Sequence, residues 1–598
     1  MKNNTNLNPE LLIADYVSQA AAALYQVPVD GLNIQTQVTR KDFEGDITAV
    51  MFSLLKQSRK SPEATGQEIG AYLKENFPQI KDFNVVKGFL NLSLSDAYWN
   101  EVFAAIVAHP DFGQAPDSGR NVMIEFSSPN TNKPLHLGHI RNNLLGWSVS
   151  RLLEACGHRV TRVNLVNDRG IHICKSMLAW KRWGNGETPA TSGKKGDHLV
   201  GDYYVLFNTK LKEEIDALVA GGMEKEVAEK QAPLLKEAQE MLFAWENGDP
   251  ETVALWQMMN GWVYEGFDET YRRLGISFER TYYESQTYLF GKELVINGLE
   301  RGIFEKQEDG SVWCDLTADG LDRKLLLRGD GTSVYMTQDL GTARQRFEEY
   351  SLDEHIYVVG NEQNYHFQVL KLILKKLGFD WSDSIYHLSY GMVELPQGKM
   401  KSREGTVVDA DDLLDKMYQT AKETSLELGK LADMDEQEQH RLFEMISLGA
   451  LKYFIIKVDP RKTMLFDPRE SIDFNGNTGP FIQYTHARIQ SILRKAQDAG
   501  IQAACEAVGL LPKEVNIIKL LNNFPAKVLE AGRALSPALV ANYAYELAKE
   551  FNQYYHDTSI LKEENAQVRA NRLKMIAVIA EVLRKAMDLL GIQLPDRM

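Results

Sequence analysis

The sequence has few cysteines and no long apolar run. Only 4 of its 598 residues are cysteine, and no two of them form a CxxC pair. This scarcity argues against a zinc-ribbon site and a disulfide framework, so we expect reduced thiols and no structural metal. No stretch approaches the ~20 apolar residues that span a bilayer. The polar start MKNNTNLNPE lacks the apolar core of a secretory signal, so we expect a cytoplasmic protein without a membrane segment.

Positive charge is also scarce. The formal net charge is −15, which argues against nonspecific affinity for nucleic acid because phosphate binding depends on clustered Lys and Arg. A local basic face on an acidic body remains compatible with this balance. Hydrophobic residues make up 44% and charged residues 25%, as in an ordinary globular protein. Composition alone therefore does not point to RNA.

The length predicts about three to five domains. Residues 1–115 have the pattern of a small α/β domain that ends in the linker HPDFGQAPDSGR. Residues 116–395 alternate strands and helices, with a Lys/Glu-rich helical insertion at about 185–325 whose charged run we interpret as a solvated surface. Residues 396–470 form a connecting helical region, and 471–598 show only helical spacing, which predicts an all-α bundle.

The second of these segments predicts a parallel sheet. NVMIEFSS is a short apolar strand, PNTNKPLHLG a turn-rich loop, and GHIRNNLLGWSVSRLLEACG a helix that ends at Gly157, followed by the strand RVTRVNLVND. The same alternation returns in HIYVVG, YHFQVLKLILKKLG and SIYHLSYGMVEL. Strand, loop, helix and strand in this order favour a Rossmann-type α/β domain.

His136-Leu137-Gly138-His139 lies where the first strand leads into its helix. Nucleotides bind at this place on a doubly wound sheet, and the helix start offers free N–H groups to phosphate. Gly138 leaves room for an adenine ring at the backbone, and both histidines can stabilise charge that develops on phosphate. A match of four residues is weak alone, but the strand–loop–helix setting strengthens it.

A second basic motif, Lys399-Met400-Lys401-Ser402-Arg403, follows the last strand about 260 residues later. Gly398 and Gly405 flank it, as expected of a mobile loop. Cationic side chains on such a loop can hold the β- and γ-phosphates while pyrophosphate leaves.

Together the two motifs resemble the HIGH and KMSKS motifs of class I aminoacyl-tRNA synthetases. EFSSPNTNKPLHLGHIRNN, YMTQDLG, QYTHARI and the terminal DLLGIQLPDRM are similar to segments of the arginyl-tRNA synthetase family. The resemblance implies ligation of arginine to tRNA through an arginyl-adenylate, with ATP and Mg²⁺ as substrate complex and tRNA bound before activation. It implies a monomer, and it assigns ATP binding to His136, Gly138, His139, Gly391, Met392, Val393 and Lys399.

The sequence departs from that family pattern in two places. The usual second lysine of the loop is Ser402, with Lys401 before it, and the family's NDWG segment reads Asn167-Asp168-Arg169-Gly170. Arginyl enzymes that lack the second lysine often have one just before the HIGH motif, where this chain has Lys133. We therefore add Lys133 and Lys401 to His136, His139 and Lys399 as catalytic residues.

An arginine pocket needs carboxylates, because a guanidinium is always charged and is best bound in fork geometry. Glu125 ends the first strand, and Tyr335 and Asp339 lie four residues apart, on one face of an expected helix. By resemblance Asp339 and Tyr335 hold the arginine side chain. Glu125, Asn130 and Gln363 then hold its amino-acid end.

The remaining expectations concern tRNA. The helical C-terminal region resembles the family's anticodon-binding domain, and the N-terminal domain resembles one that contacts the tRNA elbow. The tRNA contacts expected by resemblance are Phe89, Asn91, Tyr484, His486, Arg488 and Met598. The C-terminal aromatics from Tyr543 to Tyr555 fit a helical core as well as base stacking.

Three other functions remain open at this stage. A class I synthetase for another amino acid has no evident use for the pair Glu125 and Asp339. A small-molecule nucleotidyltransferase shares the HxGH motif but does not need a large helical C-terminal domain. An inactive paralogue that binds RNA or protein is compatible with the altered loop, although HLGH, Lys399 and Asp339 are intact.

The role of Lys133 is testable. Lys133→Ala should lower the rate of ATP–pyrophosphate exchange by roughly 10²-fold, because one donor to the transition-state charge is lost. An unchanged exchange rate would show that Lys133 does not supply charge to ATP.

Overall fold

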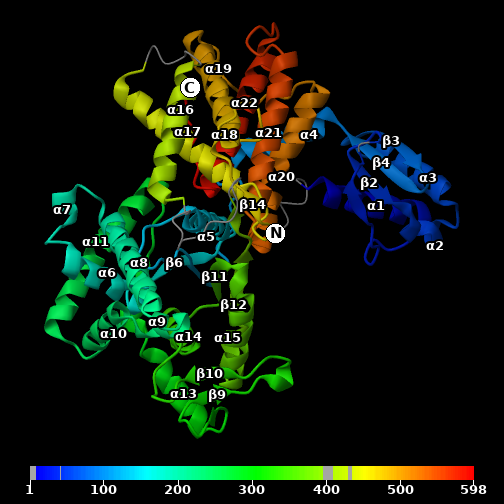
Figure 1. The fold of residues 1–598 in the computed structure, drawn as a ribbon. Helices are drawn as coiled ribbons and strands as arrows, with labels where there is room; N and C mark the ends of the chain where they lie inside the picture. The colour runs from blue at the N-terminus through cyan, green and yellow to red at the C-terminus, as the bar shows by residue number, and fades with distance from the viewer. Residues whose placement is uncertain (1–7, 41, 395–407, 428–433) are drawn as a thin grey trace.

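A computed structural model describes residues 8–40, 42–394, 408–427 and 434–598. The N-terminal domain, blue in Figure 1, lies to one side of the rest of the chain. A parallel sheet lies near the centre, with the teal and green helices of the insertion to its left and below it and the yellow-to-red C-terminal helices above it. None of the described helices is long and apolar enough to cross a membrane.

The N-terminal domain is a four-stranded antiparallel sheet with helices against one face. Its strand order is β1-β2-β4-β3. Its elements are α1 (Pro9–Tyr25), β1 (Thr36–Val38), β2 (Ile47–Val50), η2 (Met51–Leu54), α2 (Leu55–Ser58), α3 (Pro62–Asn76), β3 (Ile80–Val86) and β4 (Phe89–Leu94). Asn8 and Ser61 cap α1 and α3 with side-chain acceptors, each followed by proline in the first turn, so the sequence itself specifies both helix starts.

The central sheet has five strands in the order β12-β11-β5-β6-β7, and every neighbouring pair is parallel. Its strands are β5 (Asn121–Glu125), β6 (Arg159–Val166), β7 (Arg280–Tyr283), β11 (Glu354–Gly360) and β12 (Ile385–Tyr390). The chain runs from β5 toward β6 on one side, whereas β11 lies on the other. The carboxyl ends of β5 and β11 therefore form a topological switch point, where ligands bind in such sheets. The predicted Rossmann-type sheet is confirmed.

Helices and a small sheet occupy the region between β6 and β11. The helices are α6 (Ile171–Trp183), α7 (Pro189–Ser192), α8 (Gly196–Ala220), α9 (Lys225–Gln231), α10 (Pro233–Glu246), α11 (Pro250–Leu274), α12 (Glu284–Thr287), α13 (Phe290–Glu300) and α14 (Tyr335–Tyr350). The small sheet, in the order β10-β9-β8, consists of β8 (Glu305–Lys306), β9 (Val312–Cys314) and β10 (Lys324–Leu327), with η3 (Thr317–Asp319). The segment predicted as an insertion, 185–325, thus also contributes β7 to the central sheet.

The C-terminal region is helical, as predicted. Its helices are α16 (Ala410–Glu427), α17 (Glu436–Ile456), α18 (Pro468–Ser471), α19 (Gly479–Asp498), α20 (Pro512–Ala534), α21 (Ala538–Asp557) and α22 (Ala566–Leu589). Earlier in the chain come α5 (Leu137–Ala155), η4 (Asn361–Gln363), α15 (Asn364–Lys376) and η5 (Asp380–Ser384). The strand β13 (Val393–Glu394), before α16, pairs in parallel with β14 (Met464–Leu465), which lies between α17 and α18. The helix α4 (Asp96–Ala108) packs against α20, so it joins this bundle rather than the N-terminal sheet (Figure 1).

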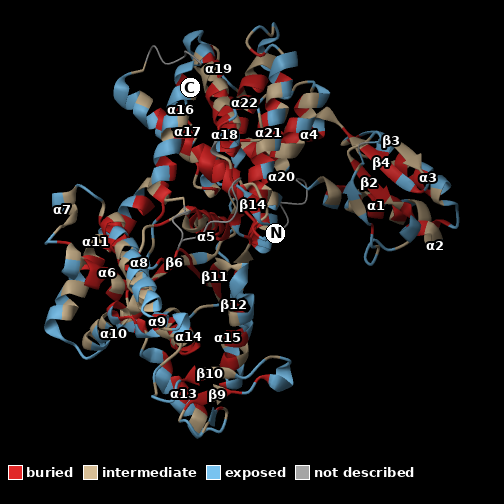
Figure 2. Cartoon of the chain, in the orientation of Figure 1, coloured by how far each residue is buried: buried red, intermediate tan, exposed pale blue. Residues whose placement is uncertain are grey.

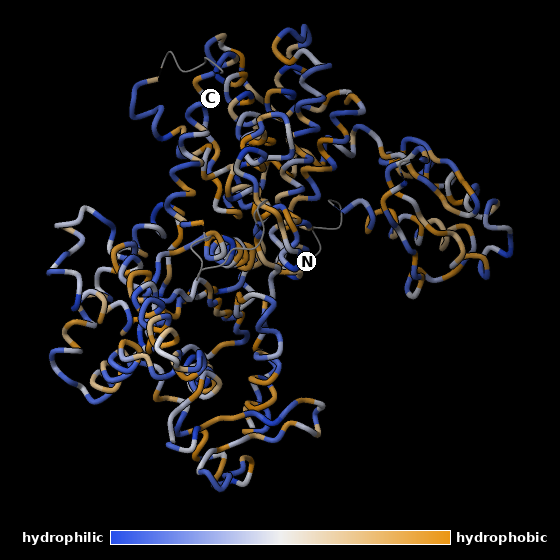
Figure 3. Tube along the Cα trace, viewed as in Figure 1, coloured by the Kyte–Doolittle hydropathy of each residue, from blue (hydrophilic) through white to orange (hydrophobic). Residues whose placement is uncertain are grey.

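Buried residues concentrate inside the bundle and the central sheet, whereas the outer helix faces and loops are exposed (Figure 2). Along the C-terminal helices, hydrophobic and hydrophilic stretches alternate, as the helical spacing requires (Figure 3). One continuous core includes residues of the N-terminal domain, α5, α17 and α19–α22. The start of α5 is therefore fixed to both the sheet and the bundle.

The turn after β5 has an unusual backbone that other elements hold in place. Ser127 and Ser128 have φ of +80° and +47°, in the left-handed region that non-glycine residues rarely adopt. Asn142 Oδ1 accepts from the Ser127 amide at 2.6 Å, and Asn142 Nδ2 donates to Val358 O at 2.7 Å and to Tyr390 Oη at 3.2 Å. The side chain of Asn142, on α5, thus joins the turn to the ends of β11 and β12.

Asn142→Ala should lower the stability of the catalytic region. The substitution leaves the Ser127 amide and Val358 carbonyl unpaired in the interior, at about 1–3 kcal/mol for each group. Thermal unfolding checks this, and we expect a clearly lower Tm. Asn143→Ala is the matched control, because Asn143 is also buried but no described residue forms a hydrogen bond with its side-chain amide. Equal Tm losses in the two variants would contradict the joining role of Asn142.

Candidate active site

The HLGH motif forms the first turn of α5. His136 is the N-cap residue, and its Nδ1 accepts from the Gly138 amide at 3.1 Å. His139 Nδ1 accepts from the His136 amide at 3.2 Å, and the two rings lie 3.9 Å apart between centroids. The two imidazoles therefore satisfy backbone donors at the helix start, which carries partial positive charge.

These contacts define the protonation of both rings. Burial, with Lys133 nearby, lowers the pKa of His136 to about 4. Burial, with His136 and Lys133, also lowers the pKa of His139 well below its ordinary value. Both rings are thus neutral near pH 7. Because each Nδ1 accepts a backbone N–H, the ring proton of each histidine lies on Nε2. No described residue accepts a hydrogen bond from either Nε2. The turn presents two N–H donors to a ligand.

Gly138 has a structural role in addition to the expected one. A Cβ atom at this position would lie 2.9 Å from His136 Cε1, so the glycine leaves room for the His136 ring. The sequence predicts that an adenine ring also approaches the backbone at Gly138, and this stays a prediction. The absence of a side chain allows the histidine to fold over its own helix start.

Lys133 lies beside both histidines in a partly buried position. Burial lowers the pKa of its ammonium group. The following residues pair with the segment before α16: the Leu137 amide donates to Val408 O and the Ala410 amide donates to Leu135 O, both at 3.0 Å. The other two predicted catalytic cations, Lys399 and Lys401, lie outside the described residues.

Glu125 is buried at the end of β5 and forms an ion pair with Arg346 of α14. Arg346 is fully buried, with its guanidinium carbon 4.7 Å from the centroid of the Tyr282 ring. The charge of Glu125 is therefore largely compensated within the protein. The sequence predicted Glu125 as a site residue but gave no sign of its partner Arg346, which lies far later in the chain.

Asp339 and two acids that the sequence analysis missed gather on the other side of the turn. Asp339 Oδ2 lies 2.5 Å from His366 Nε2, and the Asp339 side chain remains about one-third exposed. Burial raises the pKa of Glu284 to about 7, against the nearby charge of Arg169, and both Asp168 and Asp339 raise it further. Glu284 follows β7 directly. An acid at the carboxyl end of a strand is the sequence signal that could have identified it as a site residue.

The departure from the family pattern at Asp168-Arg169 has a structural explanation. Asp168 accepts from the Ser285 amide at 2.8 Å, from Ser285 Oγ at 2.6 Å and from Tyr264 Oη at 2.9 Å, which fixes the start of α12 beside Glu284. Arg169 stacks on Tyr288 with its guanidinium carbon 4.0 Å from the ring centroid. It lies 2.7 Å from Glu246 and 4.0 Å from Glu284.

The other residues predicted to bind arginine lie beyond the carboxyl ends of central strands or at the start of α14. Asn130 is exposed and its backbone pairs with that of Asn167, beyond the ends of β5 and β6. Gln363 is exposed in η4, directly after β11. Tyr335 begins α14 one turn before Asp339, and it is 74% exposed, so nothing in the described chain orders its ring over a ligand.

The segment Gly391–Val393, predicted to bind ATP, follows β12. The Gly391 amide donates to Pro460 O at 2.9 Å, and a Cβ on Gly391 would lie 2.4 Å from the Lys462 carbonyl carbon. Only glycine permits this approach. Met392 is 39% exposed and lies near Gly360, at the end of β11, while Val393 begins β13 and is buried. The segment therefore borders the switch point.

Six residues were predicted to contact tRNA, and two of them require correction. Asn91 is buried in β4, where it accepts from Thr48 Oγ1 at 2.6 Å and donates to Asn84 Oδ1 at 2.8 Å. His486 is fully buried, with Nδ1 2.9 Å from Pro595 O. Both side chains are engaged in internal contacts and do not form part of a surface for RNA.

The remaining predicted tRNA contacts are at the surface or near it. Phe89 is 37% exposed, at the start of β4. Tyr484 and Arg488 are partly exposed on α19, and the Arg488 guanidinium lies over the rings of Tyr484 and Tyr555. Met598 packs against the core of the bundle. Of the C-terminal aromatics, Tyr543, Phe551 and Tyr554 are buried in that core.

Comparison with known protein families matches nearly the whole chain. Residues 101–467 match the model described as tRNA synthetases class I (R), catalytic domain. Residues 482–598 match the DALR anticodon binding domain, and residues 11–94 match the arginyl tRNA synthetase N terminal domain.

Individual relatives agree. An arginine–tRNA ligase of Bacteroides thetaiotaomicron is 60% identical, over 96% of this chain and 97% of the relative. One of Flavobacterium psychrophilum is 54% identical, over 97% of this chain and 98% of the relative. Among solved structures, the arginyl-tRNA synthetase of Thermus thermophilus has the same fold, with a TM-score of 0.77, 24% identity, and coverage of 99% of this chain and 100% of that one.

Proposed function

The chain belongs to the arginine–tRNA ligase family of class I tRNA synthetases and uses ATP to join arginine to tRNA, and we propose that arginine is activated in the crevice around the HLGH turn. The observation that supports this placement most strongly is that hydrogen-bond donors for phosphate and carboxylates for a guanidinium both lie near the switch point of the sheet. The start of α5 carries neutral N–H donors, and the starts of α12 and α14 carry the carboxylates of Glu284 and Asp339.

The donors suit the phosphate end. His136 Nε2–H and His139 Nε2–H donate to oxygens of the α-phosphate, and the ammonium of Lys133 adds a positive charge beside them. Neutral donors held by the backbone need no rearrangement as charge develops on phosphate. Lys399, Lys401 and the segment Gly391–Val393 complete the site for MgATP, the metal being part of the substrate.

The carboxylates suit the arginine side chain. Asp339 and ionised Glu284 hold the guanidinium, and Asp168 fixes Glu284 through the start of α12. Glu125, Asn130 and Gln363 line the part of the crevice nearest β5 and β11, where the amino-acid end of the substrate meets ATP. Because Arg346 compensates the charge of Glu125, the acids available for the guanidinium are Asp339 and Glu284.

The reaction has two steps. A carboxylate oxygen of arginine attacks the α-phosphorus of ATP, a new O–P bond forms, and the bond to the β-phosphate oxygen breaks to release pyrophosphate. The 2′-hydroxyl of the terminal adenosine of tRNA then attacks the mixed anhydride and AMP leaves. The chain acts as a cytoplasmic monomer, with tRNA along Phe89 and along the surface formed by Tyr484, Arg488 and Tyr555.

Asp339→Ala tests the arginine end. Removing a charged partner of the guanidinium should raise the KM for arginine by roughly 10²-fold, whereas the KM for ATP should change little. Steady-state ATP–pyrophosphate exchange with tRNA present measures both constants. Asp383→Ala is the matched control, since Asp383 is an exposed acid paired with Lys375. Parallel rises in the KM for arginine and for ATP would refute the assigned role.

The pKa of Glu284 predicts a pH dependence. A carboxyl group with a pKa of about 7 is protonated below that pH and cannot compensate the guanidinium. The KM for arginine should therefore fall as pH rises from 6 toward 7 and level off near pH 8, with at most about a tenfold change per pH unit. Glu284→Gln should have a higher KM that no longer depends on pH in this window. A wild-type KM that stays constant from pH 6 to 8 would exclude this role.

A further inference from the structure

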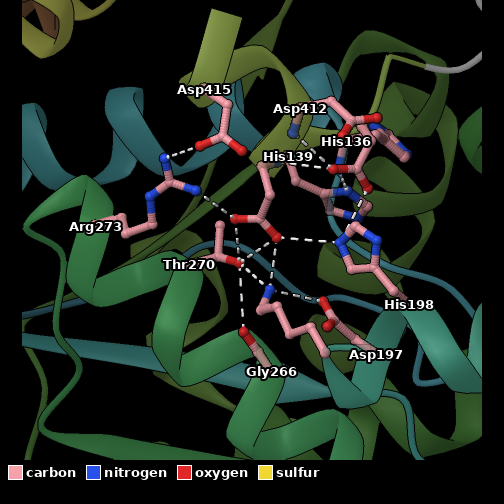
Figure 4. Close-up of polar contacts among 12 residues, drawn as sticks. His136, His139, Asp197, His198, Gly266, Thr270, Arg273, Asp412 and Asp415 are labelled. Atoms are coloured by element: carbon pink, nitrogen blue, oxygen red, sulfur yellow. Dashed lines mark hydrogen bonds and ion pairs between the residues drawn. The ribbon is translucent and has the colours of Figure 1, made fainter. Parts of the chain in front are cut away.

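A polar cluster that the proposed function does not use lies beside the HLGH turn. The cluster consists of charged and hydroxyl side chains from three helices and the residues next to them. They are Lys195, Asp197 and His198 at the start of α8, Thr270 and Arg273 on α11, and Asp409, Asp411 and Asp415 at the start of α16. Figure 4 shows Asp197, His198, Thr270 and Arg273 pointing toward one another next to His136 and His139. The cluster joins helices of the insertion to the first helix of the C-terminal region.

Lys195 is at its centre. Its Nζ lies 2.7 Å from Asp411 Oδ2, 3.1 Å from Asp197 Oδ2 and 2.6 Å from Thr270 Oγ1. The Lys195 side chain is 15% exposed, Asp411 14% and Asp197 0%, so solvent screens these contacts little. Three oxygens around one ammonium satisfy all of its donors.

Three further side chains hold Asp411 and its neighbours. His198 Nε2 lies 3.2 Å from Asp411 Oδ2 and 3.5 Å from Asp409 Oδ2. Thr270 Oγ1 donates to Asp411 Oδ1 at 3.2 Å, and Arg273 lies 2.6 Å from Asp415 Oδ1. Burial alone would raise the pKa of Asp411, but the hydrogen bonds from His198 and Lys195 hold it well below its ordinary value. Asp411 is therefore ionised under all ordinary conditions.

The start of α16 is in turn tied to the catalytic turn. Asp409 Oδ1 accepts from the amides of Asp411 and Asp412 at 2.8 and 3.1 Å, which caps the helix. The backbone of Asp409 pairs with that of His136 in an antiparallel bridge. Lys195 and His198 bind Asp411, Asp411 is bonded to Asp409, and Asp409 is paired with the backbone of His136.

The helix α8 also packs directly on the loop before His136. A Cβ on Gly201 would lie 2.9 Å from Pro134 Cδ and 3.7 Å from Lys133 Cα. A Cβ on Gly266 would lie 2.3 Å from Asp197 Oδ1, so glycine allows α8 and α11 to approach closely around the cluster. The segment from Lys133 to Leu137 is therefore enclosed between α8 and the start of α16.

We infer that Lys195 and His198 are positioning residues for arginine activation, which hold His136 and Lys133 in place by binding Asp411 and Asp409. This inference rests on the proposed role of the HLGH turn and deepens it. The insertion then fixes the distance between the phosphate donors and the carboxylates, and a displacement of about 1 Å in such a site lowers turnover by roughly 10²-fold.

The same acids do not suit a metal ion. The ligand atoms of Asp197, His198 and Asp411 lie within 4.8 Å of one another, the spacing of a cation site. However, the Lys195 ammonium already bonds to both carboxylates, and a second cation there would be repelled. The lysine is the resident positive charge.

Lys195→Met tests the inference in the full-length protein. We expect the kcat of arginine-dependent ATP–pyrophosphate exchange to fall by roughly 10- to 100-fold, with the KM for arginine unchanged within about twofold because the carboxylate end is untouched. Hydrogen exchange at the Leu137 and Ala410 amides, which join the two segments, should become at least about tenfold faster. Lys194→Met is the matched control, since Lys194 is 53% exposed and its ion-pair partner among the described residues is the exposed Asp202.

Two more variants separate positioning from general stability. Asp411→Asn should give a similar loss of kcat, and adding Lys195→Met to it should cost little more, because both residues act through one contact. If Lys195→Met lowers the Tm steeply, His198→Ala replaces it, since His198 is 30% exposed. The inference is overturned if the replacement of Lys195 or His198 leaves kcat and both amides as in Lys194→Met, or if the losses in the double variant simply add.

Failure of the proposed function would look different. If His136→Ala kept full exchange activity, the role of the HLGH turn would be wrong. The protection of the Leu137 and Ala410 amides would still report on whether Lys195 and His198 hold the two segments together.

Discussion

The arrangement of the active site depends on the turn between β5 and α5. Ser127 and Ser128 adopt left-handed backbone conformations that would relax without support, and strain of this kind persists only where the surroundings over-determine it. Asn142 supplies one restraint and Asn164 another, since Asn164 Oδ1 accepts from the Ser128 amide at 3.0 Å. These two amides fix the turn that leads from Glu125 to Asn130 and the HLGH motif at the switch point.

Two electrostatic environments follow from that geometry. At the start of α5, burial keeps His136 and His139 neutral, so positive charge comes from the helix terminus and Lys133. At α12, burial raises the pKa of Glu284, and repulsion from the charges of Asp168 and Asp339 raises it further. A cationic guanidinium relieves that repulsion, whereas a neutral side chain of the same shape leaves it in place. In the proposed site, arginine is favoured because its guanidinium can bond to the carboxylates of Asp339 and Glu284.

The sequence allowed the prediction of features that depend on local order. The HLGH turn lies between strand and helix as expected, and Asp339 lies one turn after Tyr335 on α14. Contacts between distant segments escaped prediction, because no local pattern links Glu125 to Arg346 or Lys195 to Asp411. Asn91 and His486 were placed at an RNA surface, but polar side chains also serve inside a fold when bonded groups surround them, and only the structure reveals those partners.

The central claim is that carboxylates beside the HLGH turn select a positively charged side chain. Citrulline has nearly the shape of arginine but carries no charge, so ATP–pyrophosphate exchange with each amino acid, with tRNA present, tests this claim most directly. Exchange with arginine should exceed exchange with citrulline by roughly 10⁴-fold in kcat/KM, as expected where buried polar groups would otherwise stay unpaired. Comparable rates with arginine and citrulline would contradict the account.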